Sequence, residues 1–175
     1  MHLYFIRHGE STANYGEVMT GQLDVPLTGK GRDQAREAGQ EIVTQGIHID
    51  HIICSSLMRA HDTATLIAQV IGYPEAAIEV NDLVIERSFG SLEGTPSDKS
   101  GGLTDEMIAA SGGELDPAIR LRAQLFLESL QSVDGTVLVV SHTGFGRRLR
   151  AVINNIPTAE SSNFRNAVLT DLGEI

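Results

Sequence analysis

The sequence predicts an α/β fold: a single three-layer α/β/α domain over residues 1–175, with a mostly parallel central sheet. Three observations lead to it. Short apolar runs alternate along the chain with segments whose apolar residues recur at helical spacing, as in βαβ units. Several of the runs are apolar throughout, as expected for strands that are buried on both faces. The length of 175 residues and the hydrophobic content of 41% suit one domain with a sizeable core.

The first half of the chain contains two strand–helix pairs. Thr28 is a side-chain cap for the first long helix, whose residues Ala35, Ala38 and Ile42 follow helical spacing, and Gly46 ends it. The predicted elements are, in order, a strand Leu3–Ile6, a Gly-rich loop Asn14–Gly31, the helix from Thr28 to Gly46, a strand His51–Ser55 and a helix from about Ser56 to Ile71.

The second half opens with a long stretch of little periodicity. Residues Ser88–Gly113 are rich in glycine and predict a long mobile loop, with or without one short helix. Asp116 and Pro117 read as the N-cap and first-turn pair of the next helix. The other predicted elements are a short strand near Ile78–Val80, a helix over Ile119–Leu130, a strand Val137–Val140, a helix to about Ile156 that Pro157 stops, and a last strand Ala167–Leu172.

The charge balance excludes two classes of partner. The net charge is −10 and the sequence pI is near 4.9, so we expect no binding to nucleic acid or to anionic membranes, which require a basic surface. No run of about 20 apolar residues and no signal-peptide pattern are present. The single cysteine, Cys54, lies in an apolar run and is expected to be buried. A cytoplasmic location fits these features.

Polar side chains follow three of the predicted strands. Arg7-His8 ends the first strand, Ser55-Ser56 ends the second with Arg59 in the next helix, and Ser141-His142 ends the strand before the last long helix. Because parallel strands end at the same edge of a sheet, these residues should converge there. An arginine beside a histidine in a concave site is suited to binding and attacking a phosphoryl group.

Arg59 is the most informative of these residues. A cation in the first turn opposes the helix macrodipole, which favours anions at that end by about 0.3–1 kcal/mol. An arginine can lie close to the free backbone N–H groups of a helix N-terminus when an anion binds between them and offsets both positive charges. Taken alone, Arg59 also fits a solvated position, and His142 also fits a structural histidine. The joint placement of all of them favours an anion site.

With these motifs, the chain resembles the histidine phosphatase superfamily, which includes cofactor-dependent phosphoglycerate mutase. The resemblance covers nearly the whole chain in the family's order. The matching residues are Ile6-Arg7-His8-Gly9-Glu10-Ser11, Asn14, Thr20-Gly21, Asp24, Pro26-Leu27-Thr28, Gly31, Gln34-Ala35, Ser55, Leu57, Arg59-Ala60, Thr63-Ala64, Leu83, Glu86, Phe89-Gly90, Glu93-Gly94, Val140-Ser141-His142 and Asn166.

The resemblance implies roles for five residues. His8 is the expected nucleophile, which forms a phosphohistidine. Arg7, Arg59 and His142 are expected to bind the phosphoryl oxygens, and Glu86 is expected to protonate the leaving oxygen and later to activate water. Phosphoryl transfer depends mainly on positioning and charge stabilisation, so two arginines and an imidazole suffice without a metal. The second ring nitrogen of the nucleophile should donate to a fixed acceptor, such as a backbone carbonyl.

Further residues are candidates for substrate binding. Asn14, Thr20 and Gly21 match loop positions that contact phosphate or substrate in the family, and Arg87 reaches either the substrate or the solvent. The family usually has glycine after the second histidine, whereas Thr143 here either narrows the site or adds a hydroxyl contact. Residues Arg147, Arg148 and Arg150 are interpreted as a solvated basic face.

The favoured function is that of a metal-independent phosphatase acting on a small phosphorylated metabolite. The segment between Gly94 and Arg120 is brief and has Lys99 as its only base, whereas the mutases use a longer, basic cap there. The alternatives are a phosphoglycerate mutase-type phosphotransferase, a protein phosphohistidine phosphatase, against which Glu86 argues, and a non-catalytic phospho-ligand domain. His48 and His51 lack the companions of a zinc site, and no cofactor is expected. The substrate and the oligomeric state are not predicted.

Overall fold

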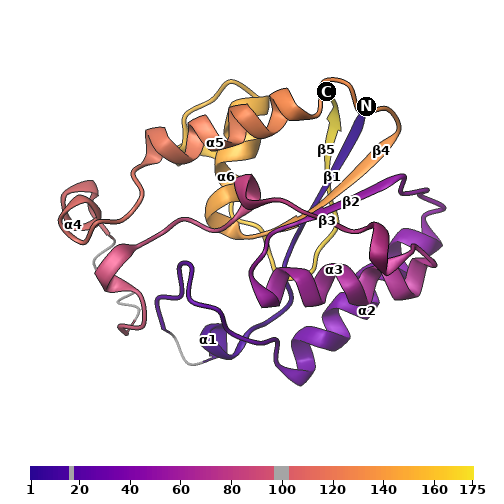
Figure 1. The fold of residues 1–175 in the computed structure, drawn as a ribbon, viewed down its shortest axis with the longest axis horizontal. Coiled ribbons are helices and arrows are strands. Elements are labelled where there is room, and N and C mark those ends of the chain that lie inside the picture. Colours follow the sequence, from indigo (N-terminus) through magenta and orange to yellow (C-terminus); the bar gives the residue numbers. More distant parts are fainter. Residues whose placement is uncertain (16–17, 97–102) are drawn as a thin grey trace.

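The computed structural model describes residues 1–15, 18–96 and 103–175, and a five-stranded sheet forms its centre (Figure 1). The strand order is β3-β2-β4-β1-β5. The strands β1 to β4 are parallel, and β5 runs antiparallel to β1. The strands span His2–Arg7 (β1), His51–Cys54 (β2), Glu79–Val80 (β3), Thr136–Ser141 (β4) and Thr170–Glu174 (β5). The predicted α/β class and the mostly parallel sheet are therefore confirmed.

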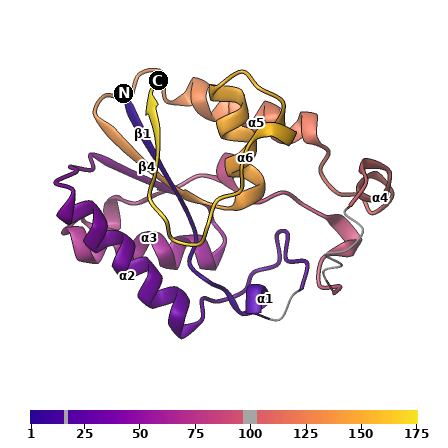
Figure 2. The ribbon, with the colours of Figure 1, turned by 180° about the vertical axis from the view of Figure 1, so that it is seen from behind.

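Helices cover both faces of this sheet, as the sequence predicts. The helices α2 and α3 pack together on one face, and α5 and α6 pack together on the other (Figures 1 and 2). The α-helices span Thr12–Tyr15 (α1), Gly29–Thr44 (α2), Met58–Ile71 (α3), Asp105–Ala110 (α4), Asp116–Ser129 (α5) and Thr143–Ile153 (α6). Short 3₁₀ turns occupy Glu75–Ala77, Asp82–Val84, Gly90–Leu92 and Thr158–Glu160.

The start of α2 agrees with the boundary predicted from the sequence, whereas the start of α5 and the end of α6 differ from it. Thr28 caps α2, because its side chain accepts a hydrogen bond from the backbone N–H of Gly31. The prediction that Asp116 is an N-cap is wrong: Leu115 holds that position, and Asp116 is the first helical residue. The helix α6 ends at Ile153 instead of near Ile156, and Asn155 then adopts a positive φ of 50°, which a continuing helix does not allow.

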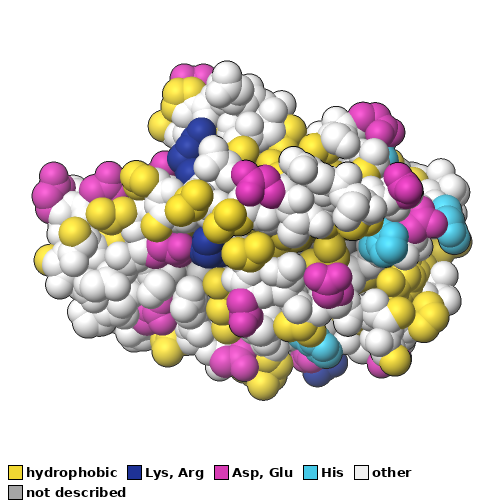
Figure 3. Space-filling model, turned by 45° about the horizontal axis from the view of Figure 1, so that its top comes forward, with side chains coloured by type: hydrophobic (Ala, Val, Ile, Leu, Met, Phe, Trp, Pro, Cys, Tyr) yellow, Lys and Arg dark blue, Asp and Glu magenta, His cyan; other side chains and the backbone are white. Residues whose placement is uncertain are grey.

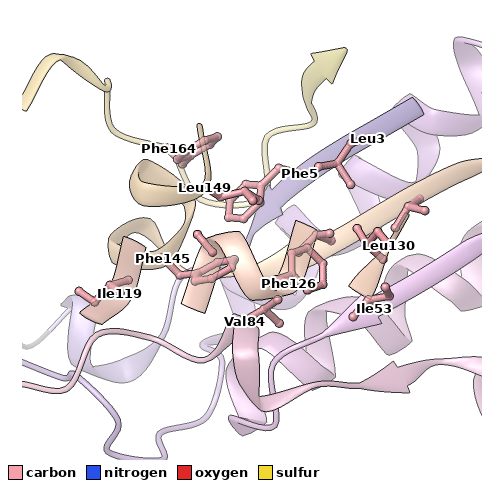
Figure 4. Packing of buried hydrophobic residues seen from close by; sticks show 13 residues of the cluster. Leu3, Phe5, Ile53, Val84, Ile119, Phe126, Leu130, Phe145, Leu149 and Phe164 are labelled. Carbon is pink, nitrogen blue, oxygen red and sulfur yellow. The ribbon is translucent and has the colours of Figure 1, made fainter. Parts of the chain in front are cut away.

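The hydrophobic core is divided by the sheet into two clusters. On the α5–α6 side, the aromatic rings of Phe5, Phe126 and Phe145 pack with aliphatic residues of β1 and β4 (Figure 4). On the α2–α3 side, Ile42 and Ile67 pack against the opposite faces of the same strands. Because β1 and β4 contribute to both clusters, Leu3, Phe5 and Ile6 of β1 and all of β4 after Thr136 are buried. This explains the uninterrupted apolar runs in the sequence.

The predicted loop Ser88–Gly113 contains the 3₁₀ turn 90–92 and the helix α4, and its residues 97–102 lie outside the described part of the chain. Cys54 is fully buried in β2 as predicted, and burial raises the pKa of its thiol to about 12. Within the described ranges, we find no helix with the length and apolar character that crossing a membrane requires.

Candidate active site

Sheet register brings the predicted strand-end residues to one edge. Arg7 of β1 is aligned with Ser141 of β4, and the His8 N–H donates to the Ser141 carbonyl at 2.9 Å. The Ser55 N–H donates to the Val140 carbonyl at 3.1 Å, so the end of β2 lies level with them. Residues separated by more than 130 positions in sequence thus meet at the carboxyl edge, where the sequence predicts the site.

His8 is held in the state that a nucleophile needs. Its Nδ1 lies 2.7 Å from the Gly9 carbonyl oxygen and donates to it, which leaves the lone pair of Nε2 free. The side chain is 4% exposed. Burial, together with the nearby guanidinium groups of Arg59 and Arg7, holds the pKa of His8 well below 6.5. The imidazole is therefore neutral at physiological pH.

Gly9 has a packing role beside this histidine. A Cβ at residue 9 would collide with the Gly31 carbonyl, and a Cβ at Gly31 would collide with the Glu10 carbonyl. Only glycines allow the backbone after β1 to cross so close to the first turn of α2. The Gly9 N–H also donates to Thr63 Oγ1 at 3.1 Å, which connects this crossing to α3.

Arg59 lies at the start of α3 and is only 1% exposed. Its Nη1 donates to the Leu23 carbonyl and its Nη2 to the Gly21 carbonyl, both at 2.7 Å. The guanidinium therefore holds the loop that contains Thr20 and Gly21 against the pocket. Burial lowers the pKa of Arg59, while the nearby carboxylate of Glu86 acts in the opposite direction.

Arg7 supplies the second guanidinium. Its Nη1 donates to the Phe164 carbonyl at 3.1 Å, and its buried Nε has no hydrogen-bond partner among the described residues. Burial also lowers the pKa of Arg7, and the charge of Glu86 again opposes this shift. A buried donor without a partner is costly, and a bound anion would satisfy it.

His142 is fully buried next to His8, with 5.1 Å between the ring centroids. Its Nε2 lies 2.8 Å from Ser55 Oγ, and its Nδ1 has no partner among the described residues. Since Ser55 Oγ accepts the Leu57 N–H at 3.3 Å, its hydroxyl proton is available for Nε2. This arrangement favours a proton on Nδ1, where it can serve a phosphoryl oxygen. Burial, with the charge of Arg59, holds the pKa of His142 well below 6.5.

Glu86 lies at the N-terminus of α6, where backbone N–H groups are unsatisfied by the helix. Its Oε1 accepts from the N–H groups of Arg87 at 2.8 Å and Phe145 at 3.1 Å, and its Oε2 accepts from the Gly144 N–H at 3.1 Å. A Cβ at residue 144 would collide with Oε1, so glycine is needed there. The first helical amides thus hold the expected acid.

Except for His142, which neighbours His8 but is not among the lining residues, these groups line a pocket of about 410 Å³. Eight residues predicted from the sequence line it: Arg7, His8, Asn14, Thr20, Gly21, Arg59, Glu86 and Thr143. Thr143 contributes a wall, and its Oγ1 lies 3.4 Å from the Phe164 carbonyl oxygen. Three lining residues were not predicted, namely Met19, Phe89 and Leu103. They add an apolar surface to an otherwise polar pocket.

Arg87 is placed differently from the other substrate candidates. It does not line the pocket: its Nε donates to the Glu114 carbonyl at 2.7 Å, and its Nη2 lies 3.8 Å from Asp105 Oδ1. Its guanidinium carbon lies 5.6 Å from the ring centroid of Phe89. The two alternatives from the sequence were the substrate or the solvent, whereas the side chain is 8% exposed and packs against protein groups.

The interpretation of the α6 arginines as a solvated face is wrong for Arg148, whereas Arg147 and Arg150 are partly exposed and also contact protein groups. Arg148 is buried and bonds Asp116 at 2.9 Å, and Arg147 donates to the carbonyls of Thr158 and Ser161, both at 3.0 Å. Arg150 stacks on Phe164 at 3.9 Å. Arg147 and Arg150 attach the segment after α6 to the helix, and Arg148 connects α6 to α5, since guanidinium groups form several bonds in one plane.

Sequence reasoning missed Arg122, which supports Glu86. From α5, its Nη1 donates to the carbonyls of Leu83 at 2.7 Å and Ile85 at 3.0 Å, and its Nε and Nη2 pair with Glu114 at 2.7 Å each. A signal was present: Arg122 lies three residues after Ile119 and four before Phe126, both buried. An arginine on the apolar face of a helix therefore indicates a buried polar partner.

The rest of the surface contrasts with the pocket. On the face shown in Figure 3, acidic side chains are spread widely and outnumber the basic ones, in keeping with the net charge of −10. A larger groove of about 740 Å³ lies between α2 and residues 163–168, but its lining includes Glu10, Glu37 and Glu41. In that groove the three glutamates offset its cations, Arg7, Lys30 and Arg165. The smaller pocket is the one suited to a phosphoryl group, because it holds His8 together with two arginines and one glutamate.

The family model of the histidine phosphatase superfamily (branch 1) matches residues 3–173. The chain belongs to this superfamily. That assignment agrees with the strand-end residues, and it confirms the resemblance found in the sequence.

Similar proteins include both mutases and phosphatases. The chain is 31% identical over 166 residues to a 2,3-bisphosphoglycerate-dependent phosphoglycerate mutase of Mesorhizobium japonicum, covering 86% of this chain and 79% of the relative. It is 36% identical over 96 residues to the mutase of Parvibaculum lavamentivorans, covering 55% of this chain. That match spans 46% of the mutase, about half of its length.

Among solved structures, the mycobacterial glucosyl-3-phosphoglycerate phosphatase in complex with VO3 superposes with a TM-score of 0.77 at 26% identity. The match covers 97% of this chain and 90% of that one. The comparisons thus establish an enzyme family that acts on small phosphorylated compounds.

Proposed function

We propose that this protein is a metal-independent phosphatase that hydrolyses a small phosphorylated metabolite through a phosphohistidine at His8. The observation that carries the proposal is the hydrogen bond from His8 Nδ1 to the Gly9 carbonyl, inside a pocket with two buried arginines. It makes Nε2 a neutral nucleophile where a phosphoryl group binds best.

The first step transfers the phosphoryl group to the enzyme. His8 Nε2 forms a bond to phosphorus while the bond from phosphorus to the substrate oxygen breaks. Arg7, Arg59 and the Nδ1–H of His142 stabilise the charge on the three phosphoryl oxygens. Glu86 acts as the general acid and gives a proton to the leaving oxygen.

The second step releases phosphate. Water attacks phosphorus, the Glu86 carboxylate accepts a proton from that water, and the bond between phosphorus and Nε2 breaks. His8 returns to its neutral state with Nδ1 still bonded to Gly9. No metal is required, because guanidinium and imidazole groups provide the positive charge.

Mutase activity is the second candidate, and the names of the curated relatives support it. A mutase returns the phosphoryl group to a second position of the substrate instead of transferring it to water. Incubation with 3-phosphoglycerate and 2,3-bisphosphoglycerate separates the two activities, since a mutase forms 2-phosphoglycerate and a phosphatase releases inorganic phosphate.

The proposal is tested by trapping the phosphoenzyme. A screen of phosphorylated metabolites with EDTA present should give released phosphate, and quenching should show acid-labile phosphate on the protein. Both signals should disappear in His8→Ala, with a loss of at least about 10⁴-fold in kcat/KM. The control is His51→Ala, an exposed histidine at the opposite end of β2, which should retain activity. Full activity in His8→Ala, or activity that EDTA abolishes, contradicts the proposal.

A further inference from the structure

One wall of the catalytic pocket is apolar, and the chemical steps do not use it. Met19, Phe89 and Leu103 line the pocket from three separate segments of the chain. Each is partly exposed, so the side chains present surface to whatever occupies the pocket. The phosphoryl group cannot be the ligand of this wall, because its oxygens require donors. The wall therefore faces the other part of the substrate.

Phe89 separates a cation from this surface. Its ring lines the pocket and packs against the Arg87 guanidinium, which does not line it. The backbone of Phe89 is held by the 3₁₀ turn that follows it and by Glu93, whose Oε1 accepts the Phe89 N–H at 2.9 Å. Arg87 Nε donates to the Glu114 carbonyl, and its buried Nη2 has no hydrogen-bond partner among the described residues and lies 3.8 Å from Asp105 Oδ1. A substrate group at the wall thus meets an aromatic ring instead of the charge behind it.

The charges inside the pocket disfavour a second anion. Among the described lining residues, the two arginines are Arg7 and Arg59, and the mechanism uses both for the phosphoryl group. Glu86 lies in the same pocket. A carboxylate or second phosphate on the substrate at this wall would lie next to apolar side chains, where an unpaired charge is costly.

We propose that the substrate is a phosphate monoester whose alcohol part is uncharged and has an apolar or aromatic face that packs on Met19, Phe89 and Leu103. This inference rests on the proposed function and narrows its substrate class. It also favours hydrolysis over the mutase reaction, because a bisphosphorylated intermediate carries a second anion into the pocket.

A matched pair of substrates tests the proposal. In 4-(carboxymethyl)phenyl phosphate and its amide, 4-(carbamoylmethyl)phenyl phosphate, a methylene separates the differing group from the ring, so the leaving phenols have nearly equal acidity. The two esters have nearly the same size and differ by one negative charge. We expect kcat/KM to be higher for the amide by at least about tenfold, because the carboxylate finds no partner at the wall.

Position 19 provides a matched pair of variants. The Met19 N–H donates to the Thr95 carbonyl at 2.9 Å and its carbonyl accepts the Gly94 N–H at 2.8 Å, and a side-chain change keeps both bonds. Met19→Lys adds a cation to the wall, and Met19→Gln adds polarity without charge. The lysine variant should raise kcat/KM for the carboxylate ester relative to the amide by about fivefold or more, while the glutamine variant should not.

The outcomes separate this inference from the function on which it rests. If wild type hydrolyses neither ester nor any other phosphate monoester, the proposed function fails. If both esters are hydrolysed with equal kcat/KM, or the carboxylate is preferred, the substrate class is wrong while the phosphatase assignment stands. An unchanged ratio in Met19→Lys also overturns the inference, because the wall then does not contact the substrate.

Discussion

The two sides of the catalytic pocket are built by different kinds of bond. On the phosphate-binding side, Arg7 ends β1, and His8 and His142 directly follow β1 and β4, which are paired by a continuous backbone ladder. On the acid side, Glu86 belongs to a segment outside any strand, which side chains hold in place. Ser141 Oγ donates to the Val84 carbonyl at 2.6 Å, and Gln22 Nε2 to the Glu86 carbonyl at 2.9 Å.

This difference separates two functional requirements. In the proposed reaction the phosphoryl group is common to all substrates, and most of the groups assigned to it stand where the sheet fixes them. The leaving group varies among substrates, and it meets a segment whose position depends on a few side chains, Arg122 foremost. Substitutions on the first side should therefore affect all substrates alike, whereas those on the second should depend on the leaving group.

The largest expected effect is on the phosphate-binding side. Replacing Arg59 by methionine removes a guanidinium that stabilises transition-state charge, and we expect kcat/KM to fall by about 10²–10³-fold. The loss should be equal for alkyl phosphates and for nitrophenyl phosphate, as measured by steady-state kinetics. Arg59→Lys retains the charge without the two-pronged geometry and should lose less. A loss confined to alkyl phosphates would contradict the uniform role of this side.

A smaller, selective effect is expected on the acid side. Arg122→Met removes the bonds to the Leu83 and Ile85 carbonyls and lets Glu86 move from the leaving oxygen. We expect a loss of about tenfold or more in kcat/KM on alkyl phosphates, which need a general acid, and little loss on nitrophenyl phosphate. Glu86→Gln should show the same selectivity with a larger amplitude.

The control for Arg122 lies on the same helix. Arg120 donates to the Ile156 carbonyl at 3.1 Å and to Thr158 Oγ1 at 3.2 Å, away from the segment that carries Glu86. Arg120→Met should affect stability without changing the ratio of the two substrates. An equal ratio in the Arg122 and Arg120 variants would show that Arg122 supports only the fold.

The smallest effect is expected at the opposite end of the sheet. His2 lies between Asp171 and Glu174 of β5, 2.7 Å and 3.1 Å from their carboxylate oxygens. Burial works against its charged form, but the hydrogen bonds to both carboxylates raise the pKa of His2 above 6.5. The stabilisation from these contacts is complete below pH 6.5, the ordinary pKa of histidine in the unfolded chain. It is lost as the pH rises through the higher pKa that His2 has in the folded protein.

We therefore expect His2→Gln to lower the free energy of unfolding slightly near pH 6 and not at all near pH 8.5. Urea unfolding of both proteins across this range measures the difference. If the difference in free energy of unfolding between the two proteins grew with pH, its pH dependence would be opposite to the expected one, and the ion pairs of His2 would be excluded as its source. Activity should be unchanged at every pH, in contrast to the two sides of the pocket.

The sequence predicts the phosphate-binding side better than the acid side for a physical reason. Arg7, His8, Arg59 and His142 stand next to apolar runs, and the parallel arrangement of such runs determines where their ends meet. Their convergence follows from topology. The tautomer of His8 could also be predicted, because the acceptor of its Nδ1–H is the carbonyl of the next residue, Gly9.

The acid side depends on contacts that leave no period in the sequence. The bonds from Arg122 to two carbonyls nearly 40 residues away depend on how α5 packs, and the apolar wall combines residues from three loops. Arg87 could be predicted as a site candidate because it follows Glu86. Its position beside the Phe89 ring, however, depends on contacts with Glu114 and Asp105, which the sequence does not predict. Boundaries such as the start of α5 at Asp116 were also missed, because Asp116 bonds to Arg148 on another helix.

Cys54 has a practical consequence. It is the only cysteine of the 175-residue chain, it lies in β2 between β3 and β4, and no part of it contacts solvent. Alkylating reagents attack only the thiolate of an accessible thiol, and burial disfavours that form here. The rate of labelling at this sulfur therefore reports how often the sheet opens around β2, without any engineered probe.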